Sequence, residues 1–70
     1  MNGWYVIAED GHDADHHVDA WGEFNCEGDA RAFSIDLAAD NGWYEIKVEQ
    51  TTREEVLPRT TDSHIYPAYK

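Results

Sequence analysis

Histidine and aspartate are concentrated in one eight-residue stretch, HDADHHVD, at residues 12–19. Imidazole nitrogens and carboxylate oxygens both bind divalent metal ions, so this stretch presents several candidate ligands at once. If its end is a strand, His17 and Asp19 point the same way, and His12 and His16 can close over an ion from the loop. The spacing matches no defined structural zinc motif. A solvated acidic loop whose histidines titrate near neutrality is the alternative to a weak metal-binding module.

The sequence offers little support for an enzyme. It contains no glycine-rich phosphate loop, no nucleophile elbow and no phosphate-binding lysine motif. Cys26 is the single cysteine, so it cannot form an intrachain disulfide, and no neighbouring group marks it as a nucleophile. A chain of 70 residues also has little room to enclose a pocket of the usual volume. We therefore predict a non-catalytic protein without a cofactor.

Net charge is the strongest feature of the composition. Fifteen acidic residues face five basic ones, which gives −10 at pH 7. Residues 1–40 hold ten of the acids and a single base, Arg31, whereas residues 41–70 hold five acids and four bases. This field disfavours direct binding to nucleic acid and to anionic membrane surfaces, because both carry negative charge. It favours a partner protein with a basic surface, which would be steered toward the N-terminal half.

Two further features bear on location. The start of the chain, MNGWYVIAED, lacks the basic stretch and following apolar run of a secretory signal. No stretch approaches the roughly 20 apolar residues of a membrane span. With a single cysteine as well, the expected location is the cytoplasm.

Hydrophobic periodicity predicts a small α+β domain. Residues 4–9 are apolar on both faces, as in a central strand, and residues 17–24 alternate as a half-buried strand that pairs with it in a hairpin. Residues 26–40 carry an apolar stripe at helical spacing behind an Asn25 N-cap, and residues 43–52 alternate again. The expected fold is an antiparallel sheet of three to four strands with one helix packed on one face. The element order is β-β-α-β or, if a fourth strand forms, β-β-α-β-β.

The sequence predicts a single α+β domain, residues 1–58, and an extended C-terminal tail, residues 59–70. Residues 53–57 either continue the last strand or return as a short fourth strand, and Pro58 ends regular pairing. The tail is polar with a late apolar cluster, so it docks either on the domain or on another molecule.

The tetrapeptide Asn-Gly-Trp-Tyr occurs twice, at residues 2–5 and 41–44. The sequences that follow the two copies diverge, so we interpret the repeat as one structural solution used twice, in which a turn leads into a strand. If the two strands share a register, Tyr5 and Tyr44 lie together under the helix. The tryptophans would then lie on the opposite sheet face, as candidate partner-binding residues: Trp4, Trp21 and Trp43.

This tryptophan face has two interpretations. It joins a partner protein or a second copy of the chain in a homodimer, because large exposed apolar patches usually mark interfaces. Alternatively, the tail folds back and covers the face with Ile65, Tyr66 and Tyr69.

The acidity of the N-terminal half also has two interpretations. In size, charge and lack of catalytic motifs, the chain resembles the small inhibitors encoded by phages and other mobile elements, including anti-CRISPR and anti-restriction proteins. That resemblance implies an inhibitor or adaptor that docks on a basic surface of its target protein. Such a surface could be one that binds nucleic acid, and the acidic chain would then mimic the nucleic acid. The alternative is a homodimeric protein of a halophilic or acid-rich proteome, in which the acids only solvate the surface. The predicted docking residues are Asp13, Asp15, Asp19 and Glu23, with Trp21 as an anchor.

Overall fold

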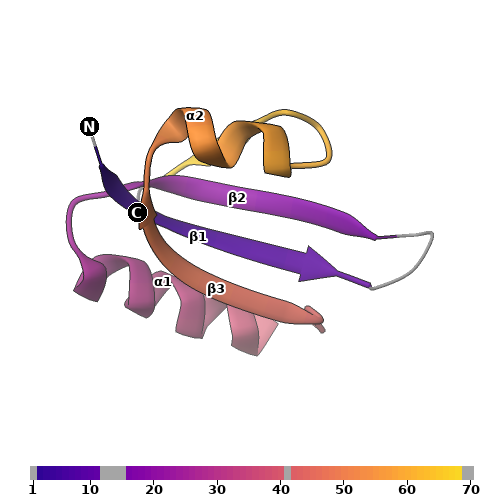
Figure 1. The fold of residues 1–70 in the computed structure, drawn as a ribbon. Coiled ribbons are helices and arrows are strands. Elements are labelled where there is room, and N and C mark those ends of the chain that lie inside the picture. Colours follow the sequence, from indigo (N-terminus) through magenta and orange to yellow (C-terminus); the bar gives the residue numbers. More distant parts are fainter. Residues whose placement is uncertain (1, 12–15, 41, 69–70) are drawn as a thin grey trace.

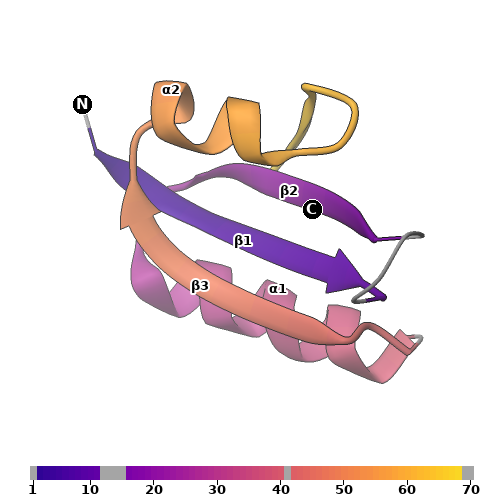
Figure 2. The same cartoon turned by 45° about the vertical axis from the view of Figure 1, so that its right-hand side comes forward.

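The computed structural model describes residues 2–11, 16–40 and 42–68. They form a four-stranded sheet, with strand order β3-β1-β2-β4, between two helical segments (Figure 1). Helix α1 covers one face of the sheet, and the short helix α2 with the 3-10 turn η1 covers the other (Figure 2). Among the described residues, no helix has the length and apolar composition of a membrane span. The elements follow one another as β1 (Gly3–Asp10), β2 (His17–Phe24), α1 (Glu27–Asp40), β3 (Glu45–Thr51), α2 (Arg53–Val56), η1 (Leu57–Arg59) and β4 (Ile65–Pro67).

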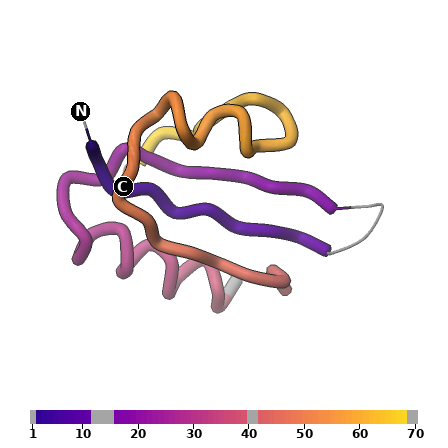
Figure 3. Tube along the Cα trace, in the orientation of Figure 1, coloured from indigo at the N-terminus to yellow at the C-terminus, as the bar shows by residue number. Residues whose placement is uncertain are grey.

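This architecture confirms the predicted small α+β fold with one main helix. β1 pairs antiparallel with both β2 and β3, whereas β4 pairs parallel with β2, so the sheet is mixed. The tube in Figure 3 shows the chain crossing from the β3 edge to the β4 edge over the face opposite α1. The fourth strand is therefore made by Ile65–Pro67, within the predicted tail.

Residues 53–57 are helical, so the strand predicted there is wrong. Thr52 is the N-cap of α2, and its hydroxyl oxygen accepts a hydrogen bond from the Glu55 backbone N–H at 3.2 Å. The segment Thr52-Arg53-Glu54-Glu55 has the spacing of a capping box, and its glutamates lie in the first turn, where the helix dipole favours negative charge. This local signal ends the strand and starts the helix.

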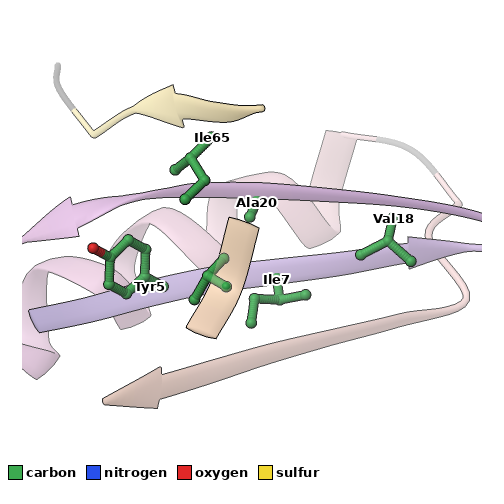
Figure 4. Packing of buried hydrophobic residues seen from close by; sticks show 6 residues of the cluster. Tyr5, Ile7, Val18, Ala20 and Ile65 are labelled. Atoms are coloured by element: carbon green, nitrogen blue, oxygen red, sulfur yellow. The ribbon is translucent and has the colours of Figure 1, made fainter. Parts of the chain in front are cut away.

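Strand β1 lies inside the sheet and is buried on both faces, as its two apolar faces predict. The core beneath α1 consists of Val6, Phe24 and Ala30, with Trp4, Trp21, Phe33, Leu37, Ile46 and Val48 packed against it. The core beneath α2 and η1, drawn in Figure 4, consists of Tyr5, Ile7, Val18, Ala20, Val56 and Ile65.

The two Asn-Gly-Trp-Tyr copies do not align in the sheet. Because β1 and β3 are antiparallel, the start of one strand lies beside the end of the other, and Tyr5 lies opposite Glu49. Tyr5 is 1% exposed beneath α2, whereas Tyr44 precedes β3 and is 58% exposed. The expectation that both tyrosines lie under the main helix is therefore wrong, and α1 instead covers the face that carries Trp4.

A β-bulge changes which side chains of β2 face α1. Trp4 pairs with Phe24 but Val6 pairs with Trp21, so β2 has one residue more than β1 between these two pairs. Strict alternation predicts Phe24 on the same face as Val18. The extra residue instead brings Phe24 onto the face of Trp21, where it joins the core beneath α1.

The segment after η1 is fastened to the edge of β2. The Thr61 N–H donates to the Val18 carbonyl at 3.0 Å, and the Val18 N–H donates to Thr61 Oγ1 at 2.7 Å. Thr60 is buried; its hydroxyl donates to the Leu57 carbonyl at 2.8 Å and accepts from the His64 N–H at 3.0 Å. These bonds hold the turn over residues 60–64 against the first half of β2.

Candidate functional site

Four carboxylates lie at the end of the sheet where β1 ends and β2 begins. Glu9 lies directly opposite Glu45 in the pairing of β1 with β3. Asp10 is the exposed last residue of β1, and Asp19 is the third residue of β2. We call these four residues, Glu9, Asp10, Asp19 and Glu45, the acidic end.

Two histidines contact these carboxylates. His16 Nε2 lies 3.2 Å from Glu9 Oε1, and His17 Nε2 lies 2.9 Å from Asp19 Oδ1. The two imidazoles, both predicted metal ligands, therefore contact carboxylates on different strands. Both rings are partly exposed to water, so solvent screens these contacts.

The arginines form their ion pairs with other glutamates, although the negative charge of Glu9 also helps to raise the pKa of Arg59, after the larger effect of its hydrogen bonds to Glu49. Arg59 donates hydrogen bonds of 2.9 and 3.1 Å to Glu49, and these bonds hold the pKa of Glu49 below its ordinary value. Arg31 pairs with Glu27 one turn earlier on α1, at 2.7 Å from Nη2 to Oε2. Within the described part of the chain, no lysine or arginine forms an ion pair with the acidic end.

The cross-strand pair of glutamates is a cost to the fold. Like charges directly opposite each other in an antiparallel sheet destabilise it, by an amount of about 0.2–1 kcal/mol for such pairs. Glu9 and Glu45 occupy such positions, and Glu45 is exposed. The pair thus opposes the local preference of the sheet, and such departures are found at functional sites.

The other acids predicted to dock are not part of one described surface. Asp13 and Asp15, together with the predicted metal ligand His12, lie outside the described residues. Glu23 is exposed near the far end of β2 from Asp19. There burial, followed by the charge of Glu23, raises the pKa of the buried Tyr5 hydroxyl.

All three tryptophans gather on the α1 side of the sheet. The Trp21 ring centroid lies 5.5 Å from that of Phe33, 5.9 Å from that of Trp43 and 5.6 Å from that of Tyr66. Trp4 packs against the same core. Helix α1 and strand β4 thus supply cover for Trp21, which is half-buried, and the stacked Tyr66 ring comes from the segment predicted to fold back.

A second cluster joins β2 to the turn after η1. Metal-ligating atoms of His17, Asp19 and Asp62 all lie within 4.8 Å of one another. The sequence pattern indicated that His17 and Asp19 share a face, and their 2.9 Å contact agrees with this. It carried no signal for Asp62, whose position depends on the hydrogen bonds between Thr61 and Val18.

Comparison with known proteins yields no match: no family model fits the chain, and no curated protein or solved structure is significantly similar to it. The functional argument therefore depends on the geometry and charge of the chain itself.

Proposed function

We propose that this protein is a non-catalytic binding module whose acidic end docks on a basic surface of a partner protein. The observation that carries the proposal is the position of Glu9, Asp10, Asp19 and Glu45 toward the same end of the sheet, with Glu9 directly opposite Glu45 on one face and Asp10 and Asp19 on the other. Among the described residues, none of the four forms an ion pair with a lysine or arginine. Such a concentration of one sign of charge accelerates encounter with a basic surface and rejects acidic ones.

The class of partner follows from the same charge. A net charge of −10 repels nucleic acid itself. A protein groove that binds nucleic acid is lined with lysine and arginine, so it attracts the acidic end. The protein would then act as an inhibitor or adaptor that competes with nucleic acid for that groove. The single cysteine suits action in the reducing cytoplasm.

The test compares two variants of equal charge. Glu9→Gln/Glu45→Gln neutralises the cross-strand pair, and Asp29→Asn/Asp36→Asn neutralises two exposed acids on α1. Proteins captured from cell extract at low salt are purified, and their affinity for each variant is measured by biolayer interferometry. Exposed ion pairs contribute about 0.2–1 kcal/mol each, so the first variant should bind roughly 2- to 30-fold more weakly. The second should bind like the wild type.

Two results would count against the proposal. Equal weakening by both variants would mean that only total charge matters, as expected for a surface that the acids merely solvate. Unchanged binding by both would mean that the partner uses another surface. Sedimentation equilibrium of the wild type distinguishes self-association: a homodimer that Trp21→Glu converts to a monomer would point to the tryptophan face instead.

Stability gives an independent check on this interpretation. If the glutamate pair is retained for binding, Glu9→Gln/Glu45→Gln should leave the urea unfolding midpoint unchanged or raise it, because the like charges are removed. A clear fall in the midpoint would mean that the pair serves the fold.

A further inference from the structure

We propose that His17, Asp19 and Asp62 form a binding site for a divalent transition-metal ion of the zinc type. This site shares Asp19 with the acidic end, but it does not rest on the proposed docking function, and its test measures metal binding alone. It differs from the histidine set indicated by the sequence, because its third ligand comes from the turn after η1 and not from the hairpin loop. The ion would fasten that turn to the first half of β2.

The ligand set suits such an ion. One imidazole nitrogen and two carboxylate oxygens are typical donors for zinc, and two carboxylates neutralise a dication. All three donor atoms lie within 4.8 Å of one another, with His17 Nε2 and Asp19 Oδ1 2.9 Å apart. Donors at tetrahedral angles and zinc distances are about 3.3–3.6 Å apart. Small rotations of partly exposed side chains therefore suffice to seat the ion.

The backbone already holds the three ligands in place. His17 and Asp19 are two residues apart on β2 and so share one face of the strand. Asp62 follows Thr61, which exchanges hydrogen bonds of 3.0 and 2.7 Å with Val18, between the two ligands on β2. Little conformational freedom is lost on binding, because the fold has already brought the turn to the strand.

The surroundings favour a cation. His17 is the register partner of Asp10 at the end of the hairpin. Across the described residues, no lysine or arginine forms an ion pair with Asp19 or Asp62. Water molecules would complete the coordination, because the cluster is partly exposed. Among the described residues, the site thus combines pre-positioned ligands with two carboxylates that form no ion pair with lysine or arginine.

Metal binding should stabilise the native fold, because the unfolded chain does not hold residues 17–19 beside residue 62. A ligand that binds only the native state raises stability in proportion to the logarithm of its concentration over Kd. At a hundredfold excess over Kd, the thermal midpoint of a domain of this size should rise by roughly 10–20 °C.

The test is calorimetric titration of the untagged full chain with zinc chloride. We expect one ion per chain. His17→Gln and Asp62→Asn should each weaken binding by roughly 10–100-fold or more, as loss of a ligand costs at least as much as loss of a supporting group. The matched controls His64→Gln and Asp36→Asn replace the same residue types outside the cluster and should bind like the wild type. Cys26→Ser excludes capture of zinc by the exposed thiol.

Nuclear magnetic resonance supplies a second readout that does not depend on a substitution. Zinc should shift the backbone amides of residues 17–19 and of residues 60–64 together. The proposal is overturned if the wild type binds no zinc at micromolar concentrations, or if His17→Gln and Asp62→Asn bind normally. It is equally overturned if His16→Gln alone abolishes binding, because the ion would then sit on the hairpin loop.

Discussion

Gly22 has no room for a side chain. It is buried in β2 at the bulge, and a Cβ added there would lie 2.5 Å from Cε2 and 3.0 Å from Cγ of Tyr5, with Cδ2 closer still. Carbon atoms in van der Waals contact are about 3.5–4.0 Å apart. Tyr5 itself is 1% exposed and is enclosed by the core beneath α2. The ring therefore cannot swing into solvent to admit a methyl group.

The expected loss of stability for Gly22→Ala follows from this overlap. Relief requires the Tyr5 ring or the β2 backbone to move by about 1 Å, and overpacking of this kind costs about 1–3 kcal/mol. A chain of 70 residues has a total stability of only about 3.5–10 kcal/mol. The variant should therefore melt roughly 5–20 °C below the wild type. A larger side chain at the same position should prevent folding.

Gly42→Ala is the matched control, because a Cβ at Gly42 would meet no atom within 4 Å. Thermal and urea unfolding of both variants can be followed by tryptophan fluorescence, since Trp21 lies beside Gly22 in the chain. The control should unfold within about 0.5 kcal/mol of the wild type. If Gly22→Ala is as stable as Gly42→Ala, the close packing of β2 against Tyr5 is refuted.

Three further predictions concern pH and the edge of the sheet. Because Arg59 lowers the pKa of Glu49, the pair stabilises the fold above the ordinary glutamate pKa of 4.5 and loses this effect as the pH falls through the lower native value. Glu49→Gln should thus cost less than about 1 kcal/mol at pH 7 and nothing near pH 2, measured by urea unfolding at both pH values. Burial raises the pKa of Tyr5 above 10.0. The contribution of this neutral hydroxyl to folding stability is therefore complete below pH 10 and is lost as the pH rises through the native pKa. Tyr5→Phe should make stability less dependent on pH in this alkaline range, as measured by unfolding followed by circular dichroism. Ile65→Ala should lower the free energy of unfolding by about 2–5 kcal/mol, because Ile65 in β4 is 4% exposed. The control Ile35→Ala, at a side chain 67% exposed on α1, should change it by less than about 0.5 kcal/mol. Equal effects of the two substitutions in thermal unfolding would show that β4 is not docked.

The elements of this fold have local signals, and most of them could be read from the sequence. The run of Trp4 to Glu9 is apolar on both faces, which predicts a central strand, and β1 is that strand. The apolar stripe after Asn25 predicts a helix over 26–40, and α1 spans Glu27–Asp40. The capping box at Thr52 was also a local signal, but the alternation before it favoured continuation of the strand, and the helix α2 was missed.

The candidate site was predictable only in part. The spacing of His17 and Asp19 on a strand was enough to place both on one face, and the 2.9 Å contact follows. Nothing near either residue indicates Asp62, because its approach depends on a pairing between Val18 and Thr61, 43 residues apart in the chain. Similarly, the opposition of Glu9 and Glu45 depends on the register of β1 with β3, which local patterns do not define.

By itself, the sequence determined the order of the first two strands, the main helix and the third strand, together with a net charge of −10 at pH 7. The tertiary structure alone decided which face α1 covers. Alternation shows which side chains share a face of a strand. Trp4 and Tyr5 lie on opposite faces of β1, and both faces are apolar, so α1 could have packed against either one. The side chains that α1 meets also depend on the antiparallel register of β1 with β3, on the bulge before Phe24 and on the pairing of β4 with β2, and each of these requires contacts between residues distant in the chain.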